Sequence, residues 1–198
     1  IPVHKLEVKL KLARLLHPEV EQSMQRRALL LQQSIAKGNA PPELGQDYMH
    51  RHKHTQWRCR LRVGPKAVEA HALFWWMHSR KGHDDGALDA ILLRGNDMPL
   101  HFDSHFWGRW GKRSELMGVL LTNMMGFFKQ YPRPPLRTVK RFYPAQPDYA
   151  AAIAQGLILG RRNGKRIVSC DTFKDHEMLS AEERQLWGKL ARKAELGV

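Results

Sequence analysis

The stretch Trp57-Arg-Cys-Arg-Leu-Arg-Val63 decides the fold class, because apolar and basic residues alternate along its whole length. Side chains of a β-strand point alternately to its two faces, so this pattern predicts a strand with one apolar and one basic face. The apolar side chains can pack on a core, whereas we expect the basic face to point to solvent. That basic face consists of Arg58, Arg60 and Arg62.

The segments that follow this strand extend the sheet. Gly64-Pro65 predicts a turn, and residues 67–78 are typical of the returning strand of a hairpin. Residues 87–94 fit a third strand. Two further short strands are expected around the dipeptide Asn163-Gly164, which is a strong hairpin signal.

The N-terminal part of the chain is predicted to be helical. Pro18 at a first helical position and Gly38 beyond the end delimit a helix over residues 18–37. Residues 3–16 fit either a strand or a helix by apolar spacing, and their composition favours a helix. Gly, Pro and Asn residues predict a loop over residues 38–50.

At the other end, the capping-box pattern Ser180-Ala-Glu-Glu183 opens a helix that is expected to run to about residue 195. Helices at both ends with strands between them indicate an α+β fold: N-terminal helices packed on a small, mostly antiparallel sheet, with a C-terminal helix. We expect an N-terminal helical segment over residues 1–50 and a basic α+β domain over residues 51–198, which together form one compact unit.

The charge balance indicates a polyanionic partner. Thirty-three Lys and Arg against nineteen Asp and Glu leave a net charge of +14. Such an excess favours RNA or another single-stranded nucleic acid over an acidic membrane surface. No apolar run approaches the roughly eighteen residues of a membrane span, so no membrane association is expected. Cys59 and Cys170 lack disulfide-framework or metal spacing and are compatible with the reducing cytoplasm.

Two basic segments are predicted to bind nucleic acid. The first is the strand face with Arg58, Arg60 and Arg62. The second mixes cations with rings that can stack on unpaired bases, a combination that suits single-stranded RNA. Its candidate residues are Arg137, Lys140, Arg141 and Tyr143.

A denser constellation lies at residues 101–113, with the sequence HFDSHFWGRWGKR. Read as a helix, it projects His105, Arg109 and Arg113 from one face, because they are spaced four residues apart. An imidazole beside two guanidiniums can hold a phosphate while a neutral ring nitrogen moves a proton. The alternative interpretation is a solvated basic face without catalytic work. No cofactor or metal is expected, since His50, His52 and His54 have no carboxylate or thiolate beside them.

The pattern His101-Phe-x-x-His105-Phe-x-x-Arg109-Trp-x-x-Arg113, followed by Gly160, Thr172-Phe173 and Met178-Leu179, resembles a family of small bacterial and phage-type proteins. That family is similar in turn to the RelE-like, colicin-type and EndoU-like ribonucleases, which work without a metal. The resemblance covers about residues 57–187 in element order. It implies His105 as the catalytic histidine, Arg109 and Arg113 as phosphate-binding cations and Thr172 as a polar strand residue at the cleavage point.

Two functions from different classes follow as hypotheses. The first is a metal-independent endoribonuclease of toxin or defence type, which cleaves RNA through its 2′-hydroxyl and implies an inhibitory protein partner. The second is a non-catalytic RNA-binding or ribonucleoprotein component, which would account for the charge and the aromatic residues equally well. A DNA-binding regulator is weaker, because no helix-turn-helix with its short Gly turn is recognisable.

Overall fold

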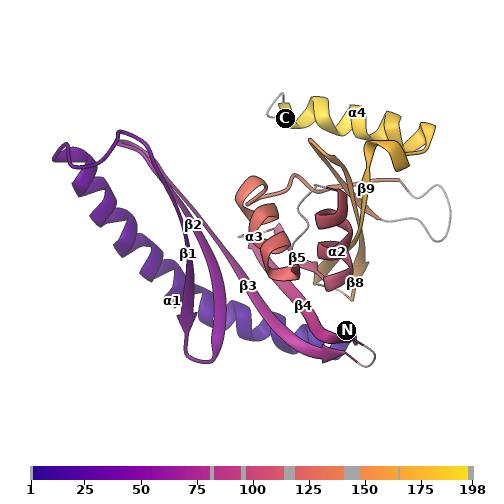
Figure 1. Cartoon of the computed structure of the whole chain (residues 1–198), viewed down its shortest axis with the longest axis horizontal. Helices are drawn as coiled ribbons and strands as arrows, with labels where there is room; N and C mark the ends of the chain where they lie inside the picture. The colour runs from indigo at the N-terminus through magenta and orange to yellow at the C-terminus, as the bar shows by residue number, and fades with distance from the viewer. Residues whose placement is uncertain are drawn as a thin grey trace. The chain divides into compact units, whose positions relative to one another are not determined.

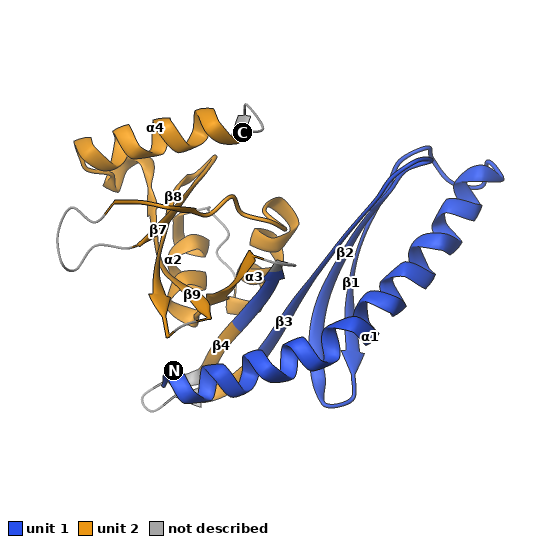
Figure 2. Ribbon diagram, turned by 180° about the vertical axis from the view of Figure 1, so that it is seen from behind, with its two compact units in different colours: residues 1–76, 90–93 blue, residues 77–89, 94–198 orange. Residues whose placement is uncertain are grey.

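The structure is a computed structural model of the chain, and it describes residues 2–80, 83–94, 97–113, 119–140, 148–164 and 166–195. The chain divides into two compact units, which Figure 2 colours separately. The first unit comprises residues 1–76 and 90–93, and the second comprises residues 77–89 and 94–198. The domain boundary expected at residue 50 lies inside the first unit.

The α+β fold class predicted from the sequence is confirmed, with a helix near each end of the chain and the strands between them (Figure 1). In chain order the elements are α1 (Val3–Ala36), β1 (Leu44–His52), β2 (Thr55–Val63), β3 (Val68–Arg80), β4 (His83–Arg94), β5 (Asp97–Phe102), α2 (Ser104–Arg113), α3 (Leu120–Gln130), β6 (Arg137–Thr138), β7 (Tyr149–Ile153), β8 (Gly156–Asn163), β9 (Ile167–Asp175), a 3₁₀ turn (His176–Met178) and α4 (Ala181–Glu195).

The strands form one mixed sheet in the order β1-β2-β3-β4-β5-β9-β8-β7-β6. β5 runs parallel to β9, whereas β1 with β2, β2 with β3, and β6 through β9 in succession pair antiparallel. The sheet is therefore larger than the sequence suggested. The predicted hairpin at Asn163-Gly164 is present: Asn163 pairs with Ile167, and Gly164 adopts a φ of +65°.

α1 continues through Pro18, where the sequence predicted a helix start. Its buried side chains recur every three or four residues on both sides of the proline, and this stripe packs on β1 and β2. Burying each larger side chain contributes about 1.5–3 kcal/mol, so the whole stripe outweighs the roughly 3 kcal/mol that an interior proline costs. The stripe comprises Leu6, Leu10, Ala13, Leu16, Val20, Met24 and Ala28.

β1 occupies a segment that the sequence predicted to be a loop. It pairs with β2 over its full length, from Leu44 opposite Val63 to His52 opposite Thr55. The residues that suggested a loop, Gly38, Pro41 and Pro42, lie before the strand and do not interrupt it. The loop prediction is therefore wrong from residue 44 onward, and β1 brings the Asp47 carboxylate beside β2.

The stretch 101–113 divides between a strand and a helix. His101 and Phe102 belong to β5, and α2 begins only at Ser104. Asp103 caps this helix, because its Oδ1 accepts a hydrogen bond from the Phe106 backbone N–H at 2.9 Å. The Phe102, Phe106 and Phe127 rings pack with centroids 4.9–5.5 Å apart, which fixes α2 and α3 against the sheet.

α4 packs on the face of β7 and β8 that carries Ala150, Ala152, Leu157 and Leu159. The predicted capping box forms: the Ser180 backbone N–H donates to Glu183 Oε2 at 2.9 Å, and the Glu183 backbone N–H donates to Ser180 Oγ at 3.2 Å. The capping box fixes the start of α4, and packing on β7 and β8 holds this helix against the sheet.

Candidate functional site

The helix α2 is amphipathic: one face is apolar and packs in the core, and the opposite face is polar. Phe106, Trp107 and Trp110 are buried, whereas His105 is exposed and Arg109 and Arg113 are half-buried. The Asn123 side chain donates to the Trp107 carbonyl at 3.2 Å and lies directly over Gly111 of α2. These contacts hold α2 in one orientation, with its polar face beside β9.

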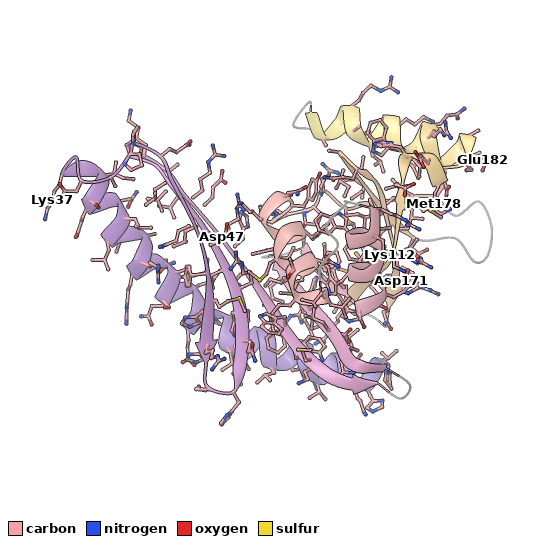
Figure 3. The ribbon with its side chains drawn as sticks, in the orientation of Figure 1. Lys37, Asp47, Lys112, Asp171, Met178 and Glu182 are labelled. Atoms are coloured by element: carbon pink, nitrogen blue, oxygen red, sulfur yellow. The ribbon has the colours of Figure 1, made fainter. Side chains whose placement is uncertain are left out.

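The structure places three predicted site residues on one face of α2 and joins this face to the fourth, Thr172 of β9. Arg109 Nη1 donates to Thr172 Oγ1 at 3.2 Å, although the two residues are 63 positions apart in the chain. We call His105, Arg109, Arg113 and Thr172 the α2–β9 strip. Figure 3 draws the side chains of this region and labels Lys112 on α2 and Asp171 on β9.

The two arginines of the strip differ in their partners. Arg113 donates to the Phe173 carbonyl and forms an ion pair with Asp175, with Nε and Oδ2 3.4 Å apart. Its charge is therefore largely compensated within the fold. Among the residues that the structure describes, Arg109 hydrogen-bonds only to the Thr172 hydroxyl and forms no ion pair, so its guanidinium retains unused donors.

The surroundings of Thr172 contain a second charge pair. The Thr172 hydroxyl donates to Asp171 Oδ1 at 3.1 Å, and Arg161 binds Asp171 Oδ2 through two nitrogens at 2.7 and 2.9 Å. No side chain within the described ranges hydrogen-bonds or ion-pairs with the exposed His105 ring. The strip therefore offers an accessible imidazole and an incompletely paired guanidinium on one helix face.

The basic face of β2 is less exposed than the sequence predicted. Arg58 is buried and lies 3.7 Å from Asp47, which also approaches Arg60 at 3.5 Å. Arg62 is exposed but pairs with Glu43 at 3.1 Å. The physical reason is that β1 supplies Asp47 and that Glu43 lies immediately before this strand. The expected exposure is therefore wrong for Arg58 and confirmed for Arg62, and nucleic-acid binding by Arg58, Arg60 and Arg62 stays a prediction.

The second predicted basic segment lies on a concave surface. Arg137 and Lys140 are exposed and line a groove between β6 and α4 with a volume of about 650 Å³. Arg141 and Tyr143 lie outside the described residues. The opposite wall carries Lys189 and Lys193, which the sequence analysis did not select. Their spacing with Leu186 and Leu190 on one helix face was the signal that could have identified them.

His101 has a structural setting unlike that of His105. It is buried in β5, where its Nδ1 lies 3.2 Å from Ser169 Oγ and its Nε2 lies 3.6 Å from Asp89 Oδ2. His78 Nε2 approaches the same Asp89 oxygen at 3.2 Å. Burial raises the pKa of Asp89, but the neighbouring His101 and His78 rings lower it by more, so the carboxyl pKa lies below its usual value.

Two general features bear on the class of site. Within the described ranges, no group of three or more His, Cys, Asp and Glu side chains is arranged to hold a metal ion. Of the helices that the structure describes, none combines the length and apolar character needed to cross a membrane.

Comparison with models of known protein families, with curated proteins and with solved structures finds no match.

Proposed function

We propose that the chain is a metal-independent endoribonuclease whose reaction takes place at the α2–β9 strip. The observation that carries the proposal is the hydrogen bond between Arg109 and Thr172, which joins a helix and a strand that are distant in the sequence. It leaves a guanidinium with unused donors on the same helix face as the exposed His105. An imidazole and an arginine are sufficient for the first steps of RNA cleavage.

In this reaction His105 removes the proton from a ribose 2′-hydroxyl. The 2′-oxygen then forms a bond to the adjacent phosphorus, and the bond from phosphorus to the 5′-oxygen breaks. Arg109 donates to the phosphate oxygens, on which negative charge increases in the transition state. The departing 5′-oxygen takes a proton from water, which leaves a 2′,3′-cyclic phosphate and a 5′-hydroxyl end.

Arg113 has a supporting role in this proposal. Its contacts with the Phe173 carbonyl and with Asp175 fix the end of α2 against β9. It positions Arg109 and His105 more than it binds phosphate, which modifies the role that the sequence suggested for it.

The direct test is incubation of the purified chain with end-labelled RNA in excess EDTA. The proposal predicts fragments that end in a 2′,3′-cyclic phosphate. Intact RNA after long incubation, or fragments that appear only when a divalent metal is added, would contradict it.

A non-catalytic RNA-binding protein is the second candidate, and one observation favours it. The groove between β6 and α4 carries four cations and is built from different elements than the α2–β9 strip. A protein that only binds RNA would need this groove and not His105. The endoribonuclease proposal includes a toxin or defence role, a location in the cytoplasm and an inhibitory protein partner. These three parts depend on RNA cleavage and are abandoned if the chain does not cleave RNA.

A further inference from the structure

We propose that the second unit binds single-stranded RNA across β6, with one base in a pocket against Tyr149 and the adjoining phosphates in the groove between β6 and α4. This inference rests on the proposed function, because it names the surface by which the same chain would hold its RNA. It adds a base-binding pocket and two lysines of α4 that the sequence did not point to.

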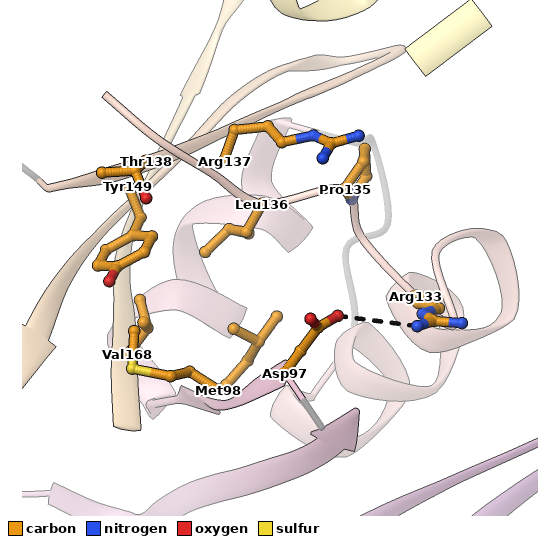
Figure 4. A pocket seen from close by; sticks show the side chains of 10 residues that line it. Asp97, Met98, Arg133, Pro135, Leu136, Arg137, Thr138, Tyr149 and Val168 are labelled. Atoms are coloured by element: carbon orange, nitrogen blue, oxygen red, sulfur yellow. Dashed lines mark ion pairs between the residues drawn. The ribbon is translucent and has the colours of Figure 1, made fainter. Parts of the chain in front are cut away.

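The pocket has a volume of about 590 Å³, within the range of small-ligand sites. Figure 4 shows the Tyr149 ring on one side of it, Leu136 and Met98 around its centre, and Asp97 on the opposite side. Asp97 Oδ2 lies 3.7 Å from the Arg133 guanidinium. The pocket therefore joins an aromatic ring and apolar side chains to one carboxylate and its cationic neighbour.

These residues match the parts of a nucleobase. A half-buried tyrosine ring offers a flat surface on which any base can stack, and the apolar side chains tolerate all four bases. The exposed Asp97 carboxylate can accept a hydrogen bond from an exocyclic amino group. Adenine, guanine and cytosine carry such a group, whereas uracil offers only its ring N3–H as a donor, so the pocket should favour the three amino bases over uracil.

The groove supplies the charge for the RNA backbone. Arg137 and Lys140 line one wall and Lys189 and Lys193 the other, and none of the described lining residues is acidic. Lysines provide mobile point charges that suit a phosphate chain without a fixed geometry. The floor is apolar and consists of Val139, Leu186 and Leu190.

The pocket and the groove are adjacent, because Arg137 and Thr138 of β6 line both. This adjacency favours a nucleic acid over an acidic peptide. A strand of RNA alternates flat bases with phosphates, and so could fill an aromatic pocket and a cationic groove at once. An acidic amphipathic helix could use the apolar floor and the lysines, but it would have no group for the Tyr149 pocket.

Binding can be measured separately from cleavage with a fluorescent 2′-O-methyl oligonucleotide, which has no 2′-hydroxyl to react. The charge reversal Lys193→Glu should weaken its binding by about tenfold or more at low salt. Arg192→Glu is the matched control, because it makes the same charge change at the neighbouring exposed position of α4, outside the groove lining. We expect it to change the affinity by less than about twofold, through long-range charge alone.

The pocket is tested by Tyr149→Leu, which keeps an apolar side chain but removes the stacking surface. Binding should weaken by about tenfold, with the slope of affinity against salt unchanged. Oligonucleotides of A, C or G should bind more tightly than those of U, and Asp97→Asn should reduce this preference. Circular dichroism and the melting temperature show whether each variant is folded.

Several outcomes would overturn the inference. Equal effects of Lys193→Glu and Arg192→Glu would exclude the groove, and unchanged affinity in Tyr149→Leu would exclude the pocket. Tight binding of poly-glutamate that depends on Lys193 but not on Tyr149 would assign the groove to an acidic protein partner. If the wild type cleaves RNA while the groove and pocket variants leave its KM unchanged, the inference fails and the proposed function stands. If no RNA is bound or cut, both fail.

Discussion

Residue chemistry separates Arg109 from several other arginines that the structure describes. Arg58, Arg60, Arg62, Arg113 and Arg161 all lie within ion-pair distance of a carboxylate, whereas Arg109 contacts a hydroxyl. Sequence spacing was enough to place the three α2 residues on one face. It could not show which cation is compensated, because the carboxylates come from β1 and β9, elsewhere in the chain.

Replacement of Gly111 by a residue with a side chain is predicted to destabilise the fold. A Cβ atom there would overlap the Asn123 amide, which is held by its hydrogen bond to the Trp107 carbonyl. We expect Gly111→Ala to lower the free energy of unfolding by about 1–3 kcal/mol, as overpacked sites do. Gly188→Ala is the control, since no atom lies within 4 Å of its Cβ position in α4. In urea unfolding, Gly188→Ala should leave the free energy of unfolding unchanged or raise it. An equal decrease of this free energy in both variants would contradict this account.

Because of Asp89, the free energy of unfolding is predicted to depend on pH in the acidic range. Its pKa is lowered in the folded state by His101 and His78 despite its burial, so its ionised form stabilises the fold. This contribution is complete above the unfolded pKa of about 4 and is lost as the pH falls through the lower folded value.

The measurement is urea unfolding of the wild type and Asp89→Asn between pH 6 and pH 3. The wild type should be more stable than the variant at pH 6, and the difference should shrink as the pH falls. A difference that is constant with pH would show that Asp89 contributes by shape and hydrogen bonding only.

At the level of elements, prediction from local signals found β2 by alternation and β3 as its returning strand. The same kind of prediction found the β8–β9 hairpin by its Asn163-Gly164 turn, and the terminal helices by apolar spacing and capping residues. It failed where a local signal competed with packing. Pro18 suggested a helix start, but the apolar stripe continues past it in α1. The strand β1 carries no clear alternation of apolar and polar residues, and its partner β2 determines its conformation. Such pairing is invisible in a single segment.

The β1–β2 pair predicts different costs for two similar substitutions. Arg58→Ala removes a buried guanidinium and leaves Asp47 with Arg60 as its remaining ion-pair partner, at 3.5 Å. It should lower the free energy of unfolding by about 1–2 kcal/mol. Arg62→Ala removes an exposed partner of Glu43 and should leave the melting temperature unchanged. Thermal melts that rank the two variants in the opposite order would contradict the register and burial described for β2.

For the whole molecule, the net charge of +14 indicates how binding should respond to salt. RNA releases counterions when its phosphates bind lysine and arginine side chains of the protein. The affinity of the protein for RNA should therefore fall by about tenfold or more between 50 and 200 mM salt. Fluorescence anisotropy with a short oligonucleotide measures this dependence. An affinity that hardly changes with salt would mean that the excess charge serves another purpose. The charge and the fold class could be predicted from the sequence, whereas the groove required α4 and β6 to be placed together.

The central claim is that His105 moves a proton at the α2–β9 strip, and one comparison tests it most directly. The rate of RNA cleavage in EDTA is measured for the wild type, His105→Ala and His54→Ala, the last being a control at another exposed histidine. His105→Ala should cleave about a hundred- to ten-thousand-fold more slowly, with the melting temperature and oligonucleotide affinity nearly unchanged, while His54→Ala should match the wild type. A His105→Ala protein that cleaves at the wild-type rate, or a wild type that never cleaves, would contradict the claim.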